Sequence, residues 1–362
     1  MSKRFDRLKK FAWMMALCPV FCLMPAHAAF INGQNYVSLA DWAGANGLSA
    51  SRTSRGDEMV LANQTTRLVF DVDSRYADIN GVRVALSFPV ANTKGALLIA
   101  QPDLETVVRP LVFSQKMSAN RITTICLDPG HGGKDTGNRA GWHYEKIYTL
   151  ALAAVVRDQL KQAGFNVIMT RARDTSVELP DRPALANERG ADLFVSLHFN
   201  ATPTGRDEVE GPETYCITPV GASSTNARGE NGEFGSAVGA GPTMANRNEQ
   251  KSLLLAYQVQ KSLVRNLGAE DRGVRRARFA VLRDAAMPAI LIEGGYMTHP
   301  VEGKKIFSGA YRRQLAQAIV KGILAYQKLT SPSVPPSPPA TNRPAGKVAA
   351  DSSARHLAGD GR

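Results

Sequence analysis

Between residues 121 and 329, short apolar runs alternate with longer segments whose apolar residues recur at helical spacing. Residues 122–127 and 193–197 are typical of the short runs, because their apolar residues are nearly continuous. Residues 145–163 are typical of the longer segments, and Gly164 follows them as a helix stop. Further strands are predicted at 166–170, 214–217, 279–282 and 289–292, and further helices at 182–189, 248–267 and 311–328. Continuous apolar strands between helices predict a three-layer αβα domain with a largely parallel sheet.

Residues 29–115 show a different pattern, in which apolar and polar residues alternate over short segments. Asn80-Gly81 separates two such segments, which is typical of a β-hairpin, and residues 39–47 predict one short helix. The region contains no histidine and no catalytic constellation, so we expect a small, mostly β accessory domain with one helix. Its tract from Ile31-Asn32-Gly33 to about Val108 resembles the small N-terminal domain type of copper amine oxidases. A β-sandwich targeting domain is the alternative.

The first 28 residues have the pattern of a removable export signal. Five basic residues precede an apolar stretch from Phe11 to Met24, and Ala26-His27-Ala28 supplies the small residues that a signal peptidase reads. A membrane anchor is the alternative, but these 14 residues, broken by Pro19, are fewer than the roughly 20 that span a bilayer. We therefore expect cleavage, export to the periplasm or cell envelope, and no stable membrane insertion afterwards.

Two further segments lack any periodic pattern. Residues 219–246 are rich in glycine, serine and asparagine, which is typical of a lid, a binding loop or a disordered segment. Residues 331–362 are rich in proline, serine and alanine, so we expect a disordered tail after a catalytic domain at 121–329.

The net charge of the chain indicates which kinds of binding partner to expect. The chain has a formal net charge of +12, and loss of residues 1–28 removes five basic residues and one acidic residue, leaving +8. This balance suits an anionic polymer such as the cell wall, or a membrane surface. No basic run is interleaved with aromatic residues, so a nucleic-acid partner is not expected.

The cysteines Cys126 and Cys216 each lie in an apolar run, which favours buried free thiols over a disulfide, although export would permit a disulfide.

Residues able to bind metal or move protons follow three of the predicted strands. His131 follows the first strand across Asp128-Pro129-Gly130, whereas His198 and Glu293 directly follow two later strands. Glu145 opens the first long helix. Because the carboxyl ends of parallel strands meet at one edge of a sheet, we expect these four side chains to lie close together.

The residue types indicate hydrolytic metal chemistry. Two histidines and one carboxylate bind a catalytic zinc ion and leave its fourth position for water. A further carboxylate is then needed to accept the proton of that water. Taken singly, a histidine after a strand is often a satisfied edge residue, and a glutamate at a helix start often serves the helix dipole. The four together favour a zinc site, because chance seldom places such residues on one edge.

Four motifs surround these residues in order along the chain. They are Leu127-Asp128-Pro129-Gly130-His131-Gly132-Gly133-Lys134-Asp135, Glu145-Lys146, Ser196-Leu197-His198-Phe199-Asn200-Ala201 and Ile292-Glu293-Gly294-Gly295-Tyr296. Residues 121–328 thereby resemble the zinc-dependent N-acetylmuramoyl-L-alanine amidases. The resemblance implies a six-stranded αβα fold and Zn²⁺ ligands at His131, Glu145 and His198, with Glu293 as the catalytic acid/base. It also implies peptidoglycan as the substrate, cut between the lactyl group of N-acetylmuramic acid and L-alanine.

Other polar residues near these motifs receive weaker assignments. Asn200 and Arg283 are predicted substrate contacts. His143, two residues before Glu145, is interpreted as a loop residue near the cleft rather than a competing ligand. His299 stands where the family usually has asparagine, and we interpret it as an inert surface residue rather than a substrate contact.

Two other functions stay open at this point. The first is that of a different zinc peptidase. The second is that of a catalytically inactive cell-wall binding or activator protein that kept the fold. The intact set of four residues argues against the inactive protein. A cell-wall or division-protein partner through residues 29–115 is a further expectation.

Overall fold

The computed structural model describes residues 28–113, 121–225 and 241–331. The predicted export signal up to residue 27, the central part of the 219–246 loop and the predicted tail from residue 332 lie outside these ranges. Within them, no helix combines the length and the apolar character that a membrane crossing requires.

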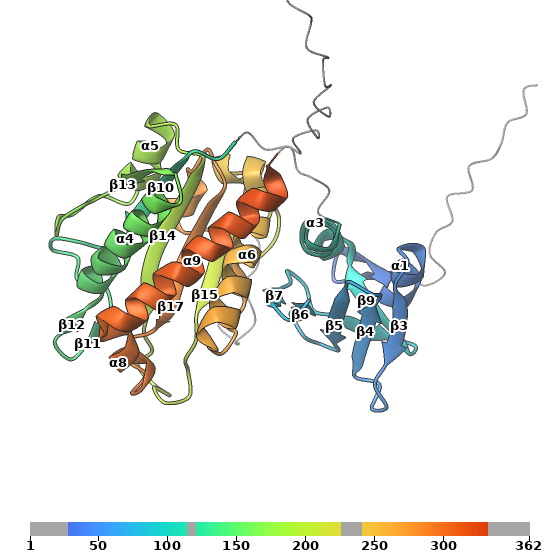
Figure 1. The fold of residues 1–362 in the computed structure, drawn as a ribbon. Helices are drawn as coiled ribbons and strands as arrows, with labels where there is room; N and C mark the ends of the chain where they lie inside the picture. Colours follow the sequence, from blue (N-terminus) through green and yellow to red (C-terminus); the bar gives the residue numbers. More distant parts are fainter. Residues whose placement is uncertain (1–27, 114–120, 226–240, 332–362) are drawn as a thin grey trace, which may run out of the picture.

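Six strands of an eleven-stranded sheet form the centre of the larger part of the molecule (Figure 1). Across the sheet the strands are, in order, β13 (Asn166–Met169), β10 (Thr124–Pro129), β14 (Leu193–Asn200), β17 (Ala289–Tyr296), β15 (Glu213–Ile217) and β16 (Val274–Ala277). The first four strands are parallel to one another, whereas β15 is antiparallel to β17 and parallel to β16. The prediction of a largely parallel, six-stranded sheet is confirmed.

Helices cover both faces of this sheet. Their bounds are α4 (Glu145–Gln162), α5 (Asp181–Glu188), α6 (Glu249–Leu267), α7 (Ala280–Arg283), α8 (Glu302–Phe307) and α9 (Gly309–Thr330), with a 3₁₀ turn, η2 (Met244–Asn248), before α6. Leu127 and Val195 share a buried cluster with residues of α4, α6 and α9, whereas Cys126 and Phe194 share one with residues of α5 and α7. Alternate strand residues thus face opposite helical layers, as the three-layer prediction requires.

The N-terminal part is small and mostly β, as predicted. It contains β1 (Ala28–Ile31), β2 (Gln34–Ser38), β3 (Ser49–Arg52), β4 (Glu58–Ala62), β5 (Arg67–Asp71), β6 (Tyr76–Ile79), β7 (Arg83–Ala85), β8 (Ala91–Thr93) and β9 (Ala96–Ala100), with α1 (Leu39–Ala45). Four of these strands form a separate sheet in the order β1-β2-β9-β8. The other five form an antiparallel series, β3 to β7.

The two parts share one continuous sheet, because β7 pairs in parallel with β16 at Val84 and Val274. Side chains reinforce this junction. The hydroxyl of Tyr257 donates to the Ile79 carbonyl at 2.9 Å, and the fully buried Arg276 donates through Nη2 to the Thr106 carbonyl at 3.0 Å. The N-terminal part is therefore bonded to the edge of the six-stranded sheet through backbone and side chains.

One predicted strand, at residues 279–282, is wrong. Ala280–Arg283 form the short helix α7, and the strand in this part of the chain is β16, which begins at Val274. A run of four apolar residues is too short to display either the helical or the strand period. Burial of Val281 and Leu282 is compatible with both structures, so the pattern alone does not distinguish them.

The N-terminal part also contains more helix than predicted. A second helical segment combines α2 (Gln101–Asp103), a π-helical turn, η1 (Leu104–Val108), and α3 (Arg109–Val112). Its buried residues recur at helical spacing, at Leu104, Val107, Val108 and Leu111. Pro102 and Pro110 lie in the first turns of α2 and α3, where proline is tolerated.

The prediction that both cysteines are buried free thiols is confirmed. Cys126 lies in β10 and Cys216 in β15, and each is a buried free cysteine.

Candidate metal centre

His131 lies in a turn after β10 that depends on glycine. Its own φ is 61°, in the left-handed region, and two of its neighbours must lack a side chain. A Cβ atom on Gly130 would lie 2.2 Å from the His198 ring, and one on Gly137 would lie 2.5 Å from the His131 ring. The glycines therefore allow the two imidazole rings to approach, with centroids 4.9 Å apart.

A buried ion pair supports this turn. Asp128 accepts hydrogen bonds from Arg182 at 2.8 Å and from the hydroxyls of Thr170 and Ser196 at 2.7 Å each. Arg182 also donates to the carbonyl oxygen of His131 at 3.0 Å. Because each charge has several partners, the pair fixes the turn without an uncompensated buried charge.

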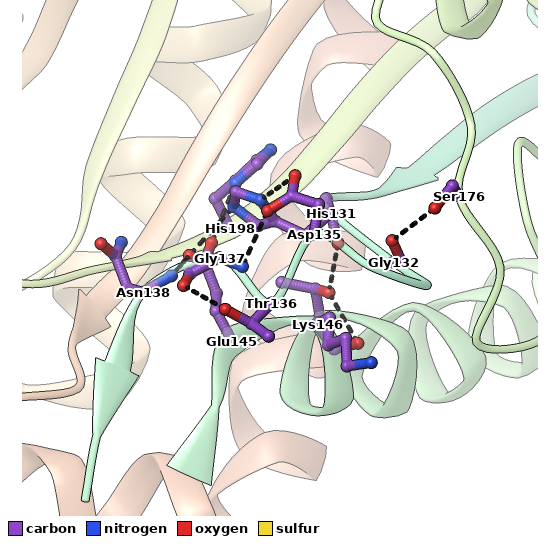
Figure 2. A network of polar contacts seen from close by, with 12 residues as sticks. His131, Gly132, Asp135, Thr136, Gly137, Asn138, Glu145, Lys146, Ser176 and His198 are labelled. Atoms are coloured by element: carbon purple, nitrogen blue, oxygen red, sulfur yellow. Dashed lines mark hydrogen bonds and ion pairs between the residues drawn. The ribbon is translucent and has the colours of Figure 1, made fainter.

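Three potential metal ligands converge beside this turn. One ligand atom from each of His131, Glu145 and His198 lies within 4.8 Å of the other two. Glu145 lies between the histidines, with Oε2 at 3.0 Å from Nε2 of His131 and Oε1 at 2.9 Å from Nδ1 of His198. Figure 2 shows the three side chains pointing toward one another from the turn, the first residue of α4 and β14. The structure thus brings together the three residues predicted as ligands.

The carboxylate of Glu145 is held by backbone donors as well as by histidines. Its side chain is buried; Oε1 accepts the N–H of Phe199 at 3.0 Å, and Oε2 accepts the N–H of Asn138 at 2.8 Å. Burial raises the pKa of Glu145, but hydrogen bonds from His131 and His198 and their positive charge outweigh burial and lower the pKa below its ordinary value. The carboxylate therefore stays ionised, which is the form that binds a cation.

A further carboxylate orients the imidazole of His131. Oδ2 of Asp135 lies 2.8 Å from Nδ1 of His131, while Oδ1 accepts the N–H of Gly137 at 3.0 Å. With Nδ1 engaged, Nε2 is the ring nitrogen that faces Glu145. A carboxylate behind a histidine is the usual support of a metal ligand, so the residues present fit a metal ion.

Glu293 lies next to this group and lacks a protein partner for one carboxylate oxygen. In the sheet it is directly opposite His198 on β14 and Glu213 on β15. Its Oε2 is buried and forms no hydrogen bond with any described residue. Burial, followed by the negative charges of Glu145 and Glu213, raises the pKa of Glu293 well above its ordinary value. A buried acid without a partner is typical of a group that exchanges protons.

The structure also reveals a buried glutamate that sequence reasoning missed. Oε1 of Glu213 accepts hydrogen bonds from Asn200 Nδ2 at 2.8 Å and from the Tyr215 hydroxyl at 2.9 Å. Its Oε2 lies 3.0 Å from Nε of Arg275, an ion pair. The sequence does contain one indication of this glutamate, because it stands at the start of an apolar strand. An acidic residue there needs partners when the strand is buried.

Two weaker histidine assignments have clear outcomes. His143 is not among the converging ligands; it lies in the short strand β12 (His143–Tyr144), and its Nδ1 bonds to the Tyr148 hydroxyl. The interpretation of His299 as a surface residue is wrong, because it is only 8% exposed. Its Nδ1 accepts the backbone N–H of Glu302, the first residue of α8, and so satisfies a free donor of that helix.

The two predicted substrate contacts occupy different surroundings. The Asn200 side chain is engaged with Glu213, as described above, and with the backbone N–H of Ala201. Arg283 is exposed at the end of α7. The assignment of both residues to substrate stays a prediction.

Residues 125–325 match the sequence profile of the N-acetylmuramoyl-L-alanine amidase family, which is more than half of the chain. The chain belongs to this family. Among curated relatives, the amidase AmiC of Neisseria meningitidis serogroup B is 37% identical over 224 residues, which are 57% of this chain and 53% of that protein. The amidase AmiA of Escherichia coli K12 is 32% identical over 232 residues, covering 59% of this chain and 78% of that protein.

The amidase family is also found among solved structures. The amidase AmiC2 of Nostoc punctiforme has 32% sequence identity and a TM-score of 0.47, and the match covers 58% of this chain and 99% of that one. The chain spans about half the length of the Neisseria relative. The matched residues include the whole candidate metal centre, whereas the small N-terminal part lies outside them.

Proposed function

We propose that the protein is a zinc-dependent N-acetylmuramoyl-L-alanine amidase acting on peptidoglycan. The bond cut is the amide between the lactyl group of N-acetylmuramic acid and L-alanine of the stem peptide. Family membership supports the reaction class. The observation that carries the proposal is the convergence of His131, Glu145 and His198 within 4.8 Å. Glu293 lies on the neighbouring strand, and its Oε2 has no hydrogen-bond partner among the described residues.

The proposed zinc ligands are His131, Glu145 and His198. Two imidazole nitrogens and a carboxylate oxygen form a common ligand set for catalytic zinc, and Asp135 supplies the outer support. When bound, zinc supplies a Lewis acid for the lactyl carbonyl and lowers the pKa of a water molecule toward about 7.

Glu293 is the proposed proton carrier. Its carboxylate accepts the proton of the attacking water and then donates it to the alanine nitrogen as the amide bond breaks. The raised pKa of Glu293 favours the first transfer, because the protonated form is stable in this buried position. The neighbouring Glu213 is engaged elsewhere, since its Oε2 lies 3.0 Å from Nε of Arg275 in an ion pair.

Three further assignments belong to the proposal. Asn200 and Arg283 contact substrate. Export to the periplasm or cell envelope brings the enzyme to its polymer, and residues 29–115 bind the cell wall or a division-protein partner. The exposed position of Arg283 supports its part of the proposal, since an unburied guanidinium is available to an anionic group.

Digestion of purified peptidoglycan followed by mass spectrometry tests this function. We expect complete stem peptides with a free L-alanine amine, together with glycan strands that have lost their peptides. Glu293→Ala should release neither product while it keeps the fold. Glu178→Ala is the matched control, because Glu178 is an exposed glutamate of the same domain, and it should digest normally.

The other functions predict different products. Cleavage inside the stem peptide with an intact lactyl amide would identify a zinc peptidase. Binding of zinc and peptidoglycan without any cleavage would identify an inactive binding or activator protein. Either result contradicts the proposed amidase.

A further inference from the structure

A tight turn near the metal centre exposes a tryptophan to solvent. The strands β11 (Arg139–Ala140) and β12 pair as an antiparallel hairpin, so Gly141 and Trp142 form its two-residue turn. Gly141 has a φ of 60°, which suits glycine at the first position of such a turn. Trp142 is 88% exposed, more than any other large hydrophobic residue in the described ranges. The face of this indole is therefore accessible to a binding partner.

The base of this hairpin is bonded to the metal centre. Asn138 and Glu145 flank it: the N–H of Glu145 donates to the Asn138 carbonyl at 2.9 Å, and the N–H of Asn138 donates to Oε2 of Glu145 at 2.8 Å. Asn138 Nδ2 also donates to the carbonyl oxygen of Phe199, next to His198, at 2.9 Å. Figure 2 shows Asn138 and Glu145 together at the hairpin base. The hairpin is thus fixed relative to the proposed zinc ligands.

The outer strand of the hairpin is held by two helices. The imidazole of His143 stacks on the Phe307 ring of α8, with centroids 3.7 Å apart and ring planes 10° apart. Its Nδ1 bonds to the hydroxyl of Tyr148 on α4. Figure 1 likewise shows β11 and β12 beside α8. Trp142 therefore extends from a rigid support, which is the arrangement that preorganises a binding residue.

The position of Glu293 indicates which half of the substrate faces the hairpin. Glu293 must lie near the leaving nitrogen to protonate it, so the peptide half extends toward β17 and β15. The hairpin connects β10 to α4 along the chain, and β10 lies on the other side of β14 from β17. The sugar half of the substrate therefore extends toward Trp142.

We propose that Trp142 stacks on a sugar ring of the glycan strand, next to the N-acetylmuramic acid whose amide is cut. The proposal rests on the amidase function proposed above. Trp142 is three residues from Glu145, a reach of about 10 Å for extended chain, which extends beyond the reacting sugar. The flat apolar face of an indole matches the flat C–H face of a pyranose ring, whereas an acidic stem peptide offers no such face.

Two substrates of different length test this subsite. One is polymeric glycan with stem peptides, and the other is a single N-acetylmuramic acid that carries a stem peptide. Trp142→Ala should lower kcat/KM for the polymer about tenfold, mainly through KM, and leave the monomer nearly unchanged. Trp142→Phe should restore part of the loss, because it keeps an aromatic face. Leu324→Ala is the control, since Leu324 is an exposed hydrophobic residue on α9 of the same domain, and it should change neither rate.

The outcomes separate the two proposals. If the wild-type protein cleaves neither substrate, the amidase function itself is contradicted. If it cleaves both and Trp142→Ala is unchanged, or loses polymer and monomer equally, the neighbouring-sugar subsite is wrong. Zinc content and the unfolding midpoint, measured for each variant, exclude a loss caused by misfolding.

Discussion

Two carboxylates lie on the same sheet, one on β10 and one on β17, and their surroundings are opposite. Asp128, on β10, accepts three side-chain hydrogen bonds and is paired with the buried Arg182. Glu293, on β17, has a carboxylate oxygen without a partner among the described residues and a raised pKa. The first arrangement fixes a turn, and the second leaves an acid ready to exchange a proton. Satisfaction of hydrogen bonds therefore separates the structural region of this sheet edge from the proposed catalytic one.

The largest expected effect concerns Glu293. Glu293→Gln should lower kcat about 1,000-fold, because a general acid and base is lost. The free energy of unfolding should not fall, because the amide replaces a carboxyl group whose Oε2 has no hydrogen-bond partner among the described residues. Activity assays together with urea unfolding measure both quantities. A variant that unfolds easily would place Glu293 with Asp128 among the structural carboxylates.

Asp128→Asn should show the reverse pattern. Removal of this charge leaves Arg182 buried and unpaired, which should lower the free energy of unfolding by about 3–5 kcal/mol. The fraction that stays folded should still bind zinc. Asp181→Asn, an exposed change at the start of α5, serves as the control. Unchanged stability in Asp128→Asn would remove the distinction between the two regions.

A third buried carboxylate, Asp103 in α2, extends the comparison to the N-terminal part. Burial raises its pKa to about 6, although the N–H groups of Ser87 and Phe88 donate to it and lower the pKa. Because the folded pKa is the higher one, its stabilising contribution is complete below about pH 4 and disappears as pH rises through 6. Relative to Asp103→Asn, the wild-type protein should lose about 3 kcal/mol across that window. Urea midpoints from pH 4 to 7 measure this; a difference that does not vary with pH contradicts it.

The smallest expected effect concerns the support of a proposed ligand. Asp135→Asn should weaken zinc binding about 10- to 100-fold, because Nδ1 of His131 loses its ionised partner. Competition with a chromophoric chelator measures the affinity. Equal affinities for the variant and the wild-type protein would mean that Asp135 does not orient the ring.

Most residues of this site could be predicted from their positions relative to the predicted strands. His131, His198 and Glu293 come at the ends of predicted strands, and parallel topology brings such ends together. In the structure, β14 and β17 extend past His198 and Glu293, to Asn200 and Tyr296, so the two residues lie within strands rather than after them. The expected edge nevertheless contains all three.

Other features depend on contacts between distant segments, which no local sequence pattern specifies. Glu213 contacts Tyr215 on its own strand. Its other partners, Asn200 on β14 and Arg275 on β16, meet it only because the sheet brings these strands together. The junction of the two parts includes a backbone pairing between Val84 and Val274, and neither segment's sequence indicates its partner. A short apolar run such as 279–282 carries no period, so α7 was predicted as a strand.

A crystal structure of the zinc-loaded protein, with anomalous scattering at the zinc edge, tests the central claim most directly. We expect one ion bonded to His131 Nε2, a carboxylate oxygen of Glu145 and Nδ1 of His198. We also expect the Glu293 carboxylate within hydrogen-bond reach of the remaining position. An ion bound elsewhere, or a Glu293 side chain directed away from it, would contradict the proposed mechanism.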